Sequence, residues 1–396
     1  MTVWLIEPRD PVIFRDGKPF NASPGARAKT LSFPFPATTA GAVRTRSGQD
    51  SSGRFASGRI TELLSQWIRG PILVELDLDN NISDWLFPAP VDGLLLKHEP
   101  HEKDKAHLVP LAVVVPPVGA RTNLPASLML VAPVEQAKQK PYPGTPAFWR
   151  WESYKAWLTA PKVQDVEFTD FAHNGPTKES RMHVSIVSGT QTAQDGALFQ
   201  TSGLEFTSLV MDGDTYPRLN QTRRLALVLD TDTTPRQGWD FLGGERRPIR
   251  WRLGPENLPG CPPAVRASIV QHKCCRLILA TPACFSNGFL PEVAKFSYYG
   301  VTVTIEAVAT SRYQVVSGWD YRLGKPKPSR RLAPAGSVYF LRLAGAHAAI
   351  GQFVDDLWLQ SISDDEQDRR DGFGLALLGA WDGAPKPLVF QSEETS

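Results

Sequence analysis

Proline and glycine interrupt this chain at short intervals, and this constrains the fold more than any other feature of the sequence. There are 34 prolines and 31 glycines among 396 residues, together about 16%, whereas globular chains usually carry about 12%. Proline cannot continue the interior of a helix, and glycine supplies the backbone angles of tight turns. The sequence therefore predicts many turns and long loops on a folded scaffold.

The length, net charge and cysteine content of the chain limit the kind of protein it can be. A length of 396 residues is enough for two or three domains at about 150 residues each. The 43 basic and 41 acidic residues leave a formal net charge of +2, so any binding of nucleic acid must come from local basic patches. The four cysteines, at 261, 274, 275 and 284, are too few and too clustered for a disulfide framework. A reducing compartment is expected.

Nothing in the chain predicts export or membrane insertion. The N-terminal sequence MTVWLIEPRD lacks a basic region followed by an apolar stretch, so no secretory signal is expected. The most apolar window, residues 108–118, is short and contains prolines, whereas a membrane helix needs about 20 apolar residues. The protein is expected to be soluble and cytoplasmic.

The first part of the chain alternates strand and helix signals. A helix is expected after Pro36, with Thr38 and Thr39 as possible N-caps and with Arg44 and Arg46 on it. The other expected elements are strands at 2–6, 72–79 and 223–230, a helix at 59–67, an aromatic helix at 148–158, and a hairpin formed by 183–188 and 196–206.

The polar stretch 231–238 marks the predicted domain boundary, near residue 235. Beyond it we expect strands at 274–280, 301–309 and 337–343, a helix at 350–361, and a last strand within 372–381. This order predicts an α+β fold with domains 1–235 and 236–396. Two RRM-related, ferredoxin-like domains of βαββαβ order, with loop and hairpin insertions, fit it.

Basic residues gather in several short segments. The run GGERRPIRWR, residues 243–252, places four arginines around Trp251. Such a group can neutralise phosphates while the aromatic ring stacks on a base, although a solvated hairpin would have the same composition. A second basic group contains Arg27, Lys29, Arg44 and Arg46, and a third contains Lys325, Lys327, Arg330 and Arg331.

The C-terminal sequence RRDGFGLALLGAW carries glycines at 372, 374 and 379. It matches neither a Walker loop nor a dinucleotide fingerprint. A glycine-rich turn can expose consecutive N–H groups to a phosphate, with Arg369 and Arg370 nearby. The ordinary alternative is a helix end that leads into a bulged strand.

The sequence contains no convincing catalytic or metal-binding set. His183, close to Arg181, has the chemistry of a general base for RNA cleavage, but no second partner can be identified. His98, His101 and His107 share a charged segment that Pro100 keeps from being helical. The acidic residues 364–366 fit a solvated turn better than a magnesium site. No catalytic residue, metal or cofactor is predicted.

Seven blocks of the sequence resemble, in the same order, the third subunit of the Cmr complex, a family of RAMP (repeat-associated mysterious protein) subunits of type III-B CRISPR systems. The blocks are IEPRDPVIFRDGKPF (6–20), FPFPATTAGAVRTRSG (33–48), WLFPAPVDGLLL (85–96), DGALFQTSGLEF (195–206), LGGERRPIRW (242–251), APAGSVYF (333–340) and GFGLALLGAW (372–381). The first block is the most specific, whereas all RAMP proteins loosely share the glycine-rich tail.

The resemblance implies a non-catalytic RNA-binding structural subunit in RNA-guided antiviral defence. Such subunits hold the 5′ tag of the CRISPR RNA (crRNA) and join the large polymerase-like subunit to the backbone RAMP subunits. Their contact with target RNA is indirect, and nucleic-acid cleavage belongs to other subunits. By matching position, the resemblance assigns RNA contact to Lys29, Arg44, Arg46, Arg181, His183, Arg246, Arg247, Gly372, Gly374 and Gly379.

Two other functions stay open on the sequence. A RAMP-type, metal-independent endoribonuclease that processes CRISPR repeat RNA is the enzyme alternative, since it would use the glycine-rich loop and His183. A pure scaffold is the third hypothesis, in which the basic groups pair with acidic surfaces of neighbouring subunits.

Overall fold

The computed structural model describes residues 1–15, 27–28, 30–50, 53–98, 102, 104–135, 139–212, 216–292, 300–320 and 325–388. Strands hold 45% of the chain and helices 18%, a mixed and mostly sheet composition that is compatible with the predicted α+β class. Residue contacts divide the chain into two compact units. Unit 1 contains residues 1–85, 175–258 and 315–331, and unit 2 contains residues 86–174, 259–314 and 332–396. Each unit thus takes segments from both sides of residue 235, and the two-domain division stays a prediction.

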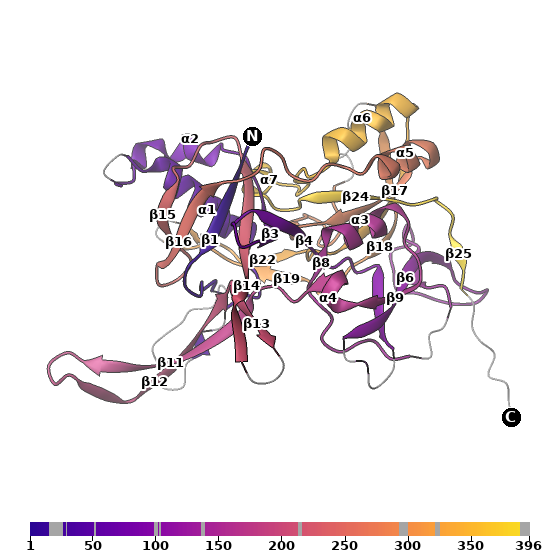
Figure 1. The fold of residues 1–396 in the computed structure, drawn as a ribbon. Coiled ribbons are helices and arrows are strands. Elements are labelled where there is room, and N and C mark those ends of the chain that lie inside the picture. The colour runs from indigo at the N-terminus through magenta and orange to yellow at the C-terminus, as the bar shows by residue number, and fades with distance from the viewer. Residues whose placement is uncertain are drawn as a thin grey trace. The chain divides into compact units, whose positions relative to one another are not determined.

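The centre of unit 1 is an antiparallel sheet in the order β3-β14-β1-β16-β15 (Figure 1). The bounds are β1 Thr2–Pro8, β3 Ile68–Leu76, β14 Tyr216–Thr231, β15 Gly238–Leu242 and β16 Arg247–Leu253. Strand β13, Thr207–Asp212, pairs with β14. Strand β4, Ile82–Pro88, follows β3 along the chain. The register aligns Leu5 with Val228 on one side and with Arg252 on the other. Val3 to Ile6 are all buried, as expected for a strand with a neighbour on both sides.

Helix α1, Pro36–Gly48, follows β1 and contacts β3 and β15. It begins at Pro36 because Phe35 is extended, the conformation that a following proline favours, and because proline fits the first helical position. The predicted N-caps Thr38 and Thr39 are therefore wrong, since both lie inside the first turns. A short 3-10 turn, Ser57–Arg59, leads into α2, Ile60–Leu64.

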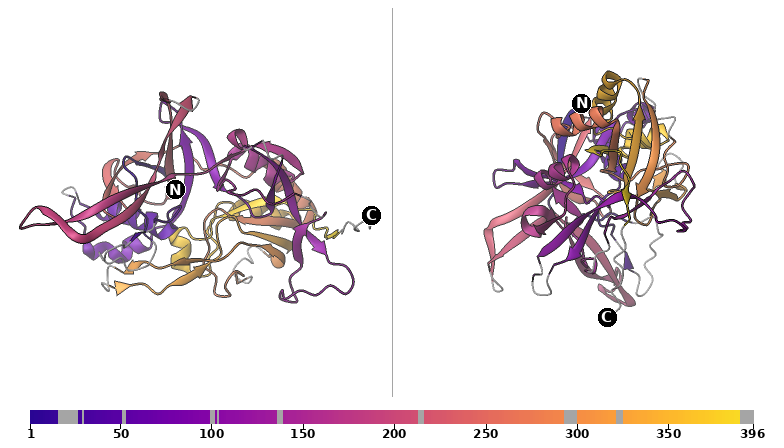
Figure 2. Two further views of the ribbon diagram at one scale, coloured as in Figure 1. Left: turned by 90° about the horizontal axis from the view of Figure 1, so that it is seen from below. Right: turned by 90° about the vertical axis from the view of Figure 1, so that its right-hand side faces the viewer.

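A long antiparallel hairpin belongs to unit 1. Its strands are β11, Thr177–Val187, and β12, Thr192–Glu205, and the two-residue strand β2, Arg27–Ala28, pairs with β12 in parallel. The hairpin extends away from the sheet, as Figure 1 and the left panel of Figure 2 show. The predicted hairpin is confirmed, and each of its strands begins earlier than expected, at Thr177 instead of 183 and at Thr192 instead of 196.

Unit 2 contains a second antiparallel sheet, in the order β18-β23-β17-β24. The bounds are β17 Cys274–Leu279, β18 Thr302–Ala309, β23 Val338–Ala344 and β24 Ala376–Ala380. Helices α5, Pro263–His272, and α6, His347–Leu357, pack against each other and against β24. Every residue of β17 is buried, including Arg276.

The remaining elements of unit 2 precede and flank this sheet. They are β5 Gly93–Lys97, β6 Lys105–Val115, β7 Leu130–Pro133, β8 Phe148–Arg150, α3 Trp151–Thr159, β9 Gln164–Glu167, α4 Phe168–Phe171, β10 Ala172–His173, α7 Glu366–Asp371 and β25 Lys386–Pro387. The expected helix at 148–158 begins only at Trp151, because 148–150 pair with β4 and β10 as strand β8. In the described part of the chain, no helix is long and apolar enough to cross a membrane.

Candidate nucleic-acid interface

The segment after β1 lies between two hairpins of unit 1. Val12 forms a bridge with Leu204 of β12, and Ile13 forms a bridge with Gly244 in the turn between β15 and β16. Space is tight on both sides: a Cβ atom at Gly203 would lie 2.8 Å from the Cβ of Pro11, and one at Gly243 would lie 2.4 Å from the carbonyl oxygen of Ile13. These close approaches explain why the two hairpins carry glycine where they meet the segment.

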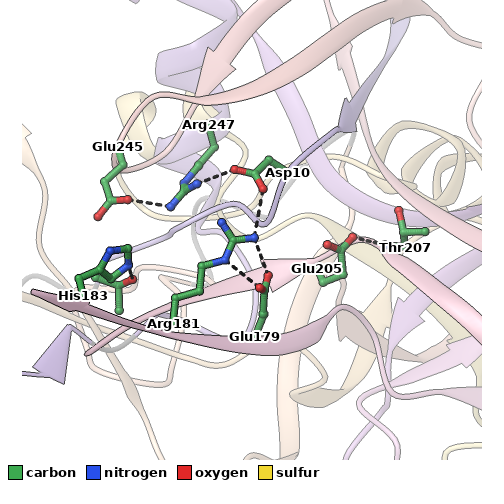
Figure 3. A network of polar contacts seen from close by, with 9 residues as sticks. Asp10, Glu179, Arg181, His183, Glu205, Thr207, Glu245 and Arg247 are labelled. Carbon is green, nitrogen blue, oxygen red and sulfur yellow. Dashed lines mark hydrogen bonds and ion pairs between the residues drawn. The ribbon is translucent and has the colours of Figure 1, made fainter. Parts of the chain in front are cut away.

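Asp10 connects the two hairpins by its charge (Figure 3). One carboxylate oxygen accepts from Nη2 of Arg181 on β11 at 3.3 Å, and the other accepts from Nη1 of Arg247 on β16 at 2.5 Å. Arg181 also binds Glu179, and Arg247 also binds Glu245. Figure 3 shows the two guanidinium groups converging on Asp10 from different strands. The structure therefore brings together Arg181 and Arg247, which are 66 positions apart in the sequence.

The charges inside this network are balanced locally, so its arginines have a fixed orientation. The hydrogen bond that Arg181 donates to Glu179 is the main reason that the pKa of Arg181 is raised. Burial opposes this increase, and the charges of Glu179 and Asp10 add to it. Arg246 and Arg250 differ: they are exposed and have no carboxylate partner among the described residues. Arg246 and Arg250 can therefore bind a phosphate without losing an ion pair to a described carboxylate.

His183 lies two residues beyond Arg181 on β11. Its Nε2 atom is 2.8 Å from Oγ1 of Thr201, and its ring stacks on Phe199 at a centroid distance of 5.4 Å. A ring held in this way can accept or donate a hydrogen bond and present a flat face to a base. A general base in RNA cleavage would also need a group to protonate the leaving oxygen.

Two of the predicted contact residues are engaged within the fold. The buried Arg44 donates from Nε to the carbonyl oxygen of Leu63 at 2.9 Å. The side chain of Arg46 is only 11% exposed, and it donates to the carbonyl oxygens of Arg236 and Gln237, both at 3.0 Å. Phosphate contact by either arginine stays a prediction, and it would require breaking these bonds. Lys29 lies outside the described residues.

The glycines of the C-terminal run lie in unit 2 and are buried. Gly372 ends α7 with φ +94°, as a left-handed C-cap, and Gly374 has φ +82° beside Ser363. Gly379 lies within β24, where a Cβ atom would be 2.9 Å from Nη2 of Arg276. The geometry at Gly372 is that of an ordinary helix end, and RNA contact by the three glycines stays a prediction.

The expected role of Trp251 is wrong, and two other rings were missed. Trp251 is 1% exposed and belongs to the core, so it cannot stack on a base. The exposed rings of this region are Trp239 and Phe241 on β15. The alternation in GWDFL, next to the predicted basic run, was the available signal. Among the described residues, no group of three or more His, Cys, Asp or Glu side chains could hold a metal ion.

Fold and site together define a sheet-rich α+β protein with a basic, aromatic edge. The chain belongs to the Cas_Cmr3 family of CRISPR-associated proteins, whose family model matches residues 4–381. The resemblance to the third Cmr subunit is thereby confirmed, and the chain is a subunit of a type III-B CRISPR effector complex.

The solved structures to which the chain is similar include two of a type III-B Cmr-beta assembly. One is described as "Cryo-EM structure of the Type III-B Cmr-beta bound to cognate target RNA", with 15% identity and a TM-score of 0.46. The other is the same assembly bound to cognate target RNA and AMPPnP, state 1, with 16% identity and a TM-score of 0.43. Each alignment covers 85% of this chain and 86% of the other. No curated protein matches the chain.

Proposed function

We propose that this chain is the non-catalytic RNA-binding subunit that holds the 5′ tag of the crRNA. In this proposal it also links the large polymerase-like subunit to the backbone RAMP subunits in the cytoplasm, and it contacts target RNA only indirectly. The observation that carries the proposal is the pair of exposed arginines without carboxylate partners among the described residues, Arg246 and Arg250, on a hairpin that the Asp10 network fixes in place. A phosphate bound there would meet cations whose charge is still available.

The strand order supports two ferredoxin-like domains. In unit 1, β16-β1-β14-β3 places the fourth, first, third and second strands side by side, all antiparallel, with α1 between the first two in sequence. In unit 2, β24-β17-β23-β18 has the same order, with α6 between the third and the fourth. This is the split βαβ arrangement. Each unit departs from this arrangement in one connection between strands. In unit 1, strand β15 stands between β14 and β16, where the arrangement has a helix. In unit 2, the described part of 280–301, between β17 and β18, contains no helix.

RNA binding is tested with the full-length chain and a fluorescent single-stranded RNA that carries the tag. We expect Arg246→Glu and Arg250→Glu to weaken binding and to reduce the dependence of affinity on salt. Removing one arginine–phosphate interaction lowers that slope by about 0.7 for a single strand. Arg54→Glu is the matched control, since Arg54 is likewise exposed on unit 1 but lies after α1. Unchanged binding by both hairpin variants would refute the site.

The enzyme alternative predicts a different result in the same preparation. An endoribonuclease that uses His183 would cleave repeat RNA in the presence of EDTA, and His183→Ala would abolish the cleavage. A tag-holding subunit leaves the RNA intact. The scaffold hypothesis predicts that the Cmr complex assembles equally well, and with equal salt sensitivity, with or without crRNA.

A further inference from the structure

We propose that strand β15 is a stacking platform for two unpaired RNA bases, one on Trp239 and one on Phe241. The inference deepens the proposed function, on which it rests, by assigning base contact to residues separate from the Asp10 network. Of all exposed large apolar side chains in the described part of the chain, these two combine an aromatic ring, a sheet edge and a neighbouring arginine.

Both rings point to the same side of β15. Residues two apart on a strand share a face and lie about 6.7 Å apart along it. Trp239 is 63% exposed and Phe241 is 48% exposed, whereas the intervening Asp240 is partly buried, with an ion pair to Arg46, and Leu242 is buried. β15 thus has a core-facing side and a side with two open rings.

An arginine accompanies each ring. The guanidinium carbon of Arg9 lies 5.8 Å from the centroid of Trp239, and that of Arg246 lies 4.5 Å from the centroid of Phe241. Arg250 of β16 is the register partner of Trp239 and shares its face. Rings flanked by cations match a nucleotide strand, which offers a π-face and a phosphate at every step.

The same cations argue against a protein as the occupant. An apolar protein surface placed over the rings would bury Arg246 and Arg250, which have no carboxylate partner among the described residues. Burying an unpaired charge is strongly unfavourable. The paired bases of a duplex are already stacked on one another, so the occupant is single-stranded.

The backbone of the turn between β15 and β16 stabilises the conformation of the platform. Glu245 and Arg246 have φ values of +60° and +49°, a conformation that side-chain-bearing residues seldom adopt. The turn is fixed against the segment after β1 by a hydrogen bond from the Gly244 N–H to the Ile13 carbonyl oxygen at 2.7 Å. Strained residues persist where the surroundings determine them and are common at binding sites. Arg246 is therefore positioned over Phe241 before any RNA arrives.

The test compares RNA affinity among full-length variants by fluorescence anisotropy with a short tagged RNA. We expect Trp239→Ala and Phe241→Ala each to weaken binding by about 5-fold to 150-fold, the range of stacking on one aromatic residue. The slope of affinity against salt should stay as in the unsubstituted protein, because no phosphate-binding group is removed. Trp239→Phe keeps a stacking ring and should recover most of the affinity. Phe55→Ala, which removes an aromatic ring that is 45% exposed elsewhere on unit 1, should change nothing.

A second RNA with abasic sugars at the tag positions separates stacking from folding. The unsubstituted protein and Trp239→Ala should bind this RNA equally, since the base that distinguishes them is gone. If the unsubstituted protein binds tagged RNA but both ring variants bind it equally well, the platform is refuted while the proposed function stands. If the ring variants keep RNA affinity but no longer enter the reconstituted complex, the face is a protein contact and the platform is also refuted. If the unsubstituted protein binds no RNA, the proposed function fails first.

Discussion

A buried ion pair in unit 2 allows the sharpest test of how this fold is held together. Arg276, in the middle of β17, and Asp92, after β4, have side chains only 2% and 1% exposed, with Nη1 and Oδ2 2.6 Å apart. The same guanidinium donates to the carbonyl oxygens of Ala380, Trp157 and Leu158, and the indole N–H of Trp157 donates to the other Asp92 oxygen at 2.9 Å. The pair therefore joins β17, β24 and the end of α3.

Asp92→Asn removes the negative charge while keeping the shape and an acceptor for Trp157. It leaves the Arg276 charge buried with only neutral partners, and removing one member of a buried pair costs about 3–5 kcal/mol. Amide hydrogen exchange measures the loss locally. The protection of β17 and β24 should fall by roughly 150-fold to 4,000-fold, at 1.4 kcal/mol for each power of ten.

Asp355→Asn is the matched control, because Asp355 makes two hydrogen bonds to Arg266 with both side chains about 45% exposed. Solvent screens this pair, so its loss should cost at most about 1 kcal/mol. The contrary outcome is that Asp92→Asn reduces protection by less than tenfold, or by no more than Asp355→Asn does. Either result would refute the claim that burial makes the Arg276–Asp92 ion pair important for stability.

Three further predictions follow from single positions. Gly243→Ala should lower the melting temperature and weaken RNA binding, because the added Cβ meets a carbonyl oxygen at 2.4 Å. Gly288 has a similar positive φ but open space around it, so Gly288→Ala should reduce stability only by the backbone strain, about 1 kcal/mol. A hydrogen bond from His107 is the main reason that the pKa of Asp165 is below its usual value. Solvent weakens this exposed pair, so the exchange protection of β6 and β9 should stay constant above about pH 4 and decrease only slightly as the pH falls further; a decrease that begins near pH 6 would contradict this assignment. Burial raises the pKa of Cys261 to about 12, so iodoacetamide at pH 8 should label it far more slowly than an exposed cysteine, as mass spectrometry would show.

The sequence predicted most elements but not how they associate. The strands at 274–280, 301–309 and 337–343 appear within two residues as β17, β18 and β23, because their apolar content reflects burial directly. The division into units was less accessible, because it depends on contacts between distant segments. Unit 1 takes up the hairpin strands β15 and β16 from beyond residue 235, since β16 pairs with β1 over Trp4 to Pro8. No local sequence pattern indicates a paired strand that lies 245 positions away, as Trp251 does from Ile6.

The candidate site shows the same limit more sharply. Arginine content indicated the right segments, but composition does not distinguish an arginine that binds a carbonyl group from one that faces solvent. Arg44 and Arg46 point into backbone carbonyls, whereas Arg246 and Arg250 are exposed. For the aromatic rings, the alternation along the two strands puts Trp251 of β16 inside and leaves Trp239 of β15, which lies opposite the exposed Arg250, outside. On β15, α1 covers the face that carries Asp240, because Asp240 forms an ion pair with Arg46 of α1.

The ion pairs of the candidate site contribute to the near-neutral net charge of the chain. In the hairpin region of unit 1, Asp10 and two glutamates neutralise Arg181 and Arg247, and this balance sets the geometry without attracting polyanions from a distance. Attraction in this part of the protein is left to Arg246 and Arg250, which are exposed and have no carboxylate partner among the described residues. A chain with a net charge of +2 would thus bind RNA, under the proposed function, through a local site and not through its overall charge. Extra lysines placed at random on its surface should raise affinity for any RNA and so reduce the preference for the tag.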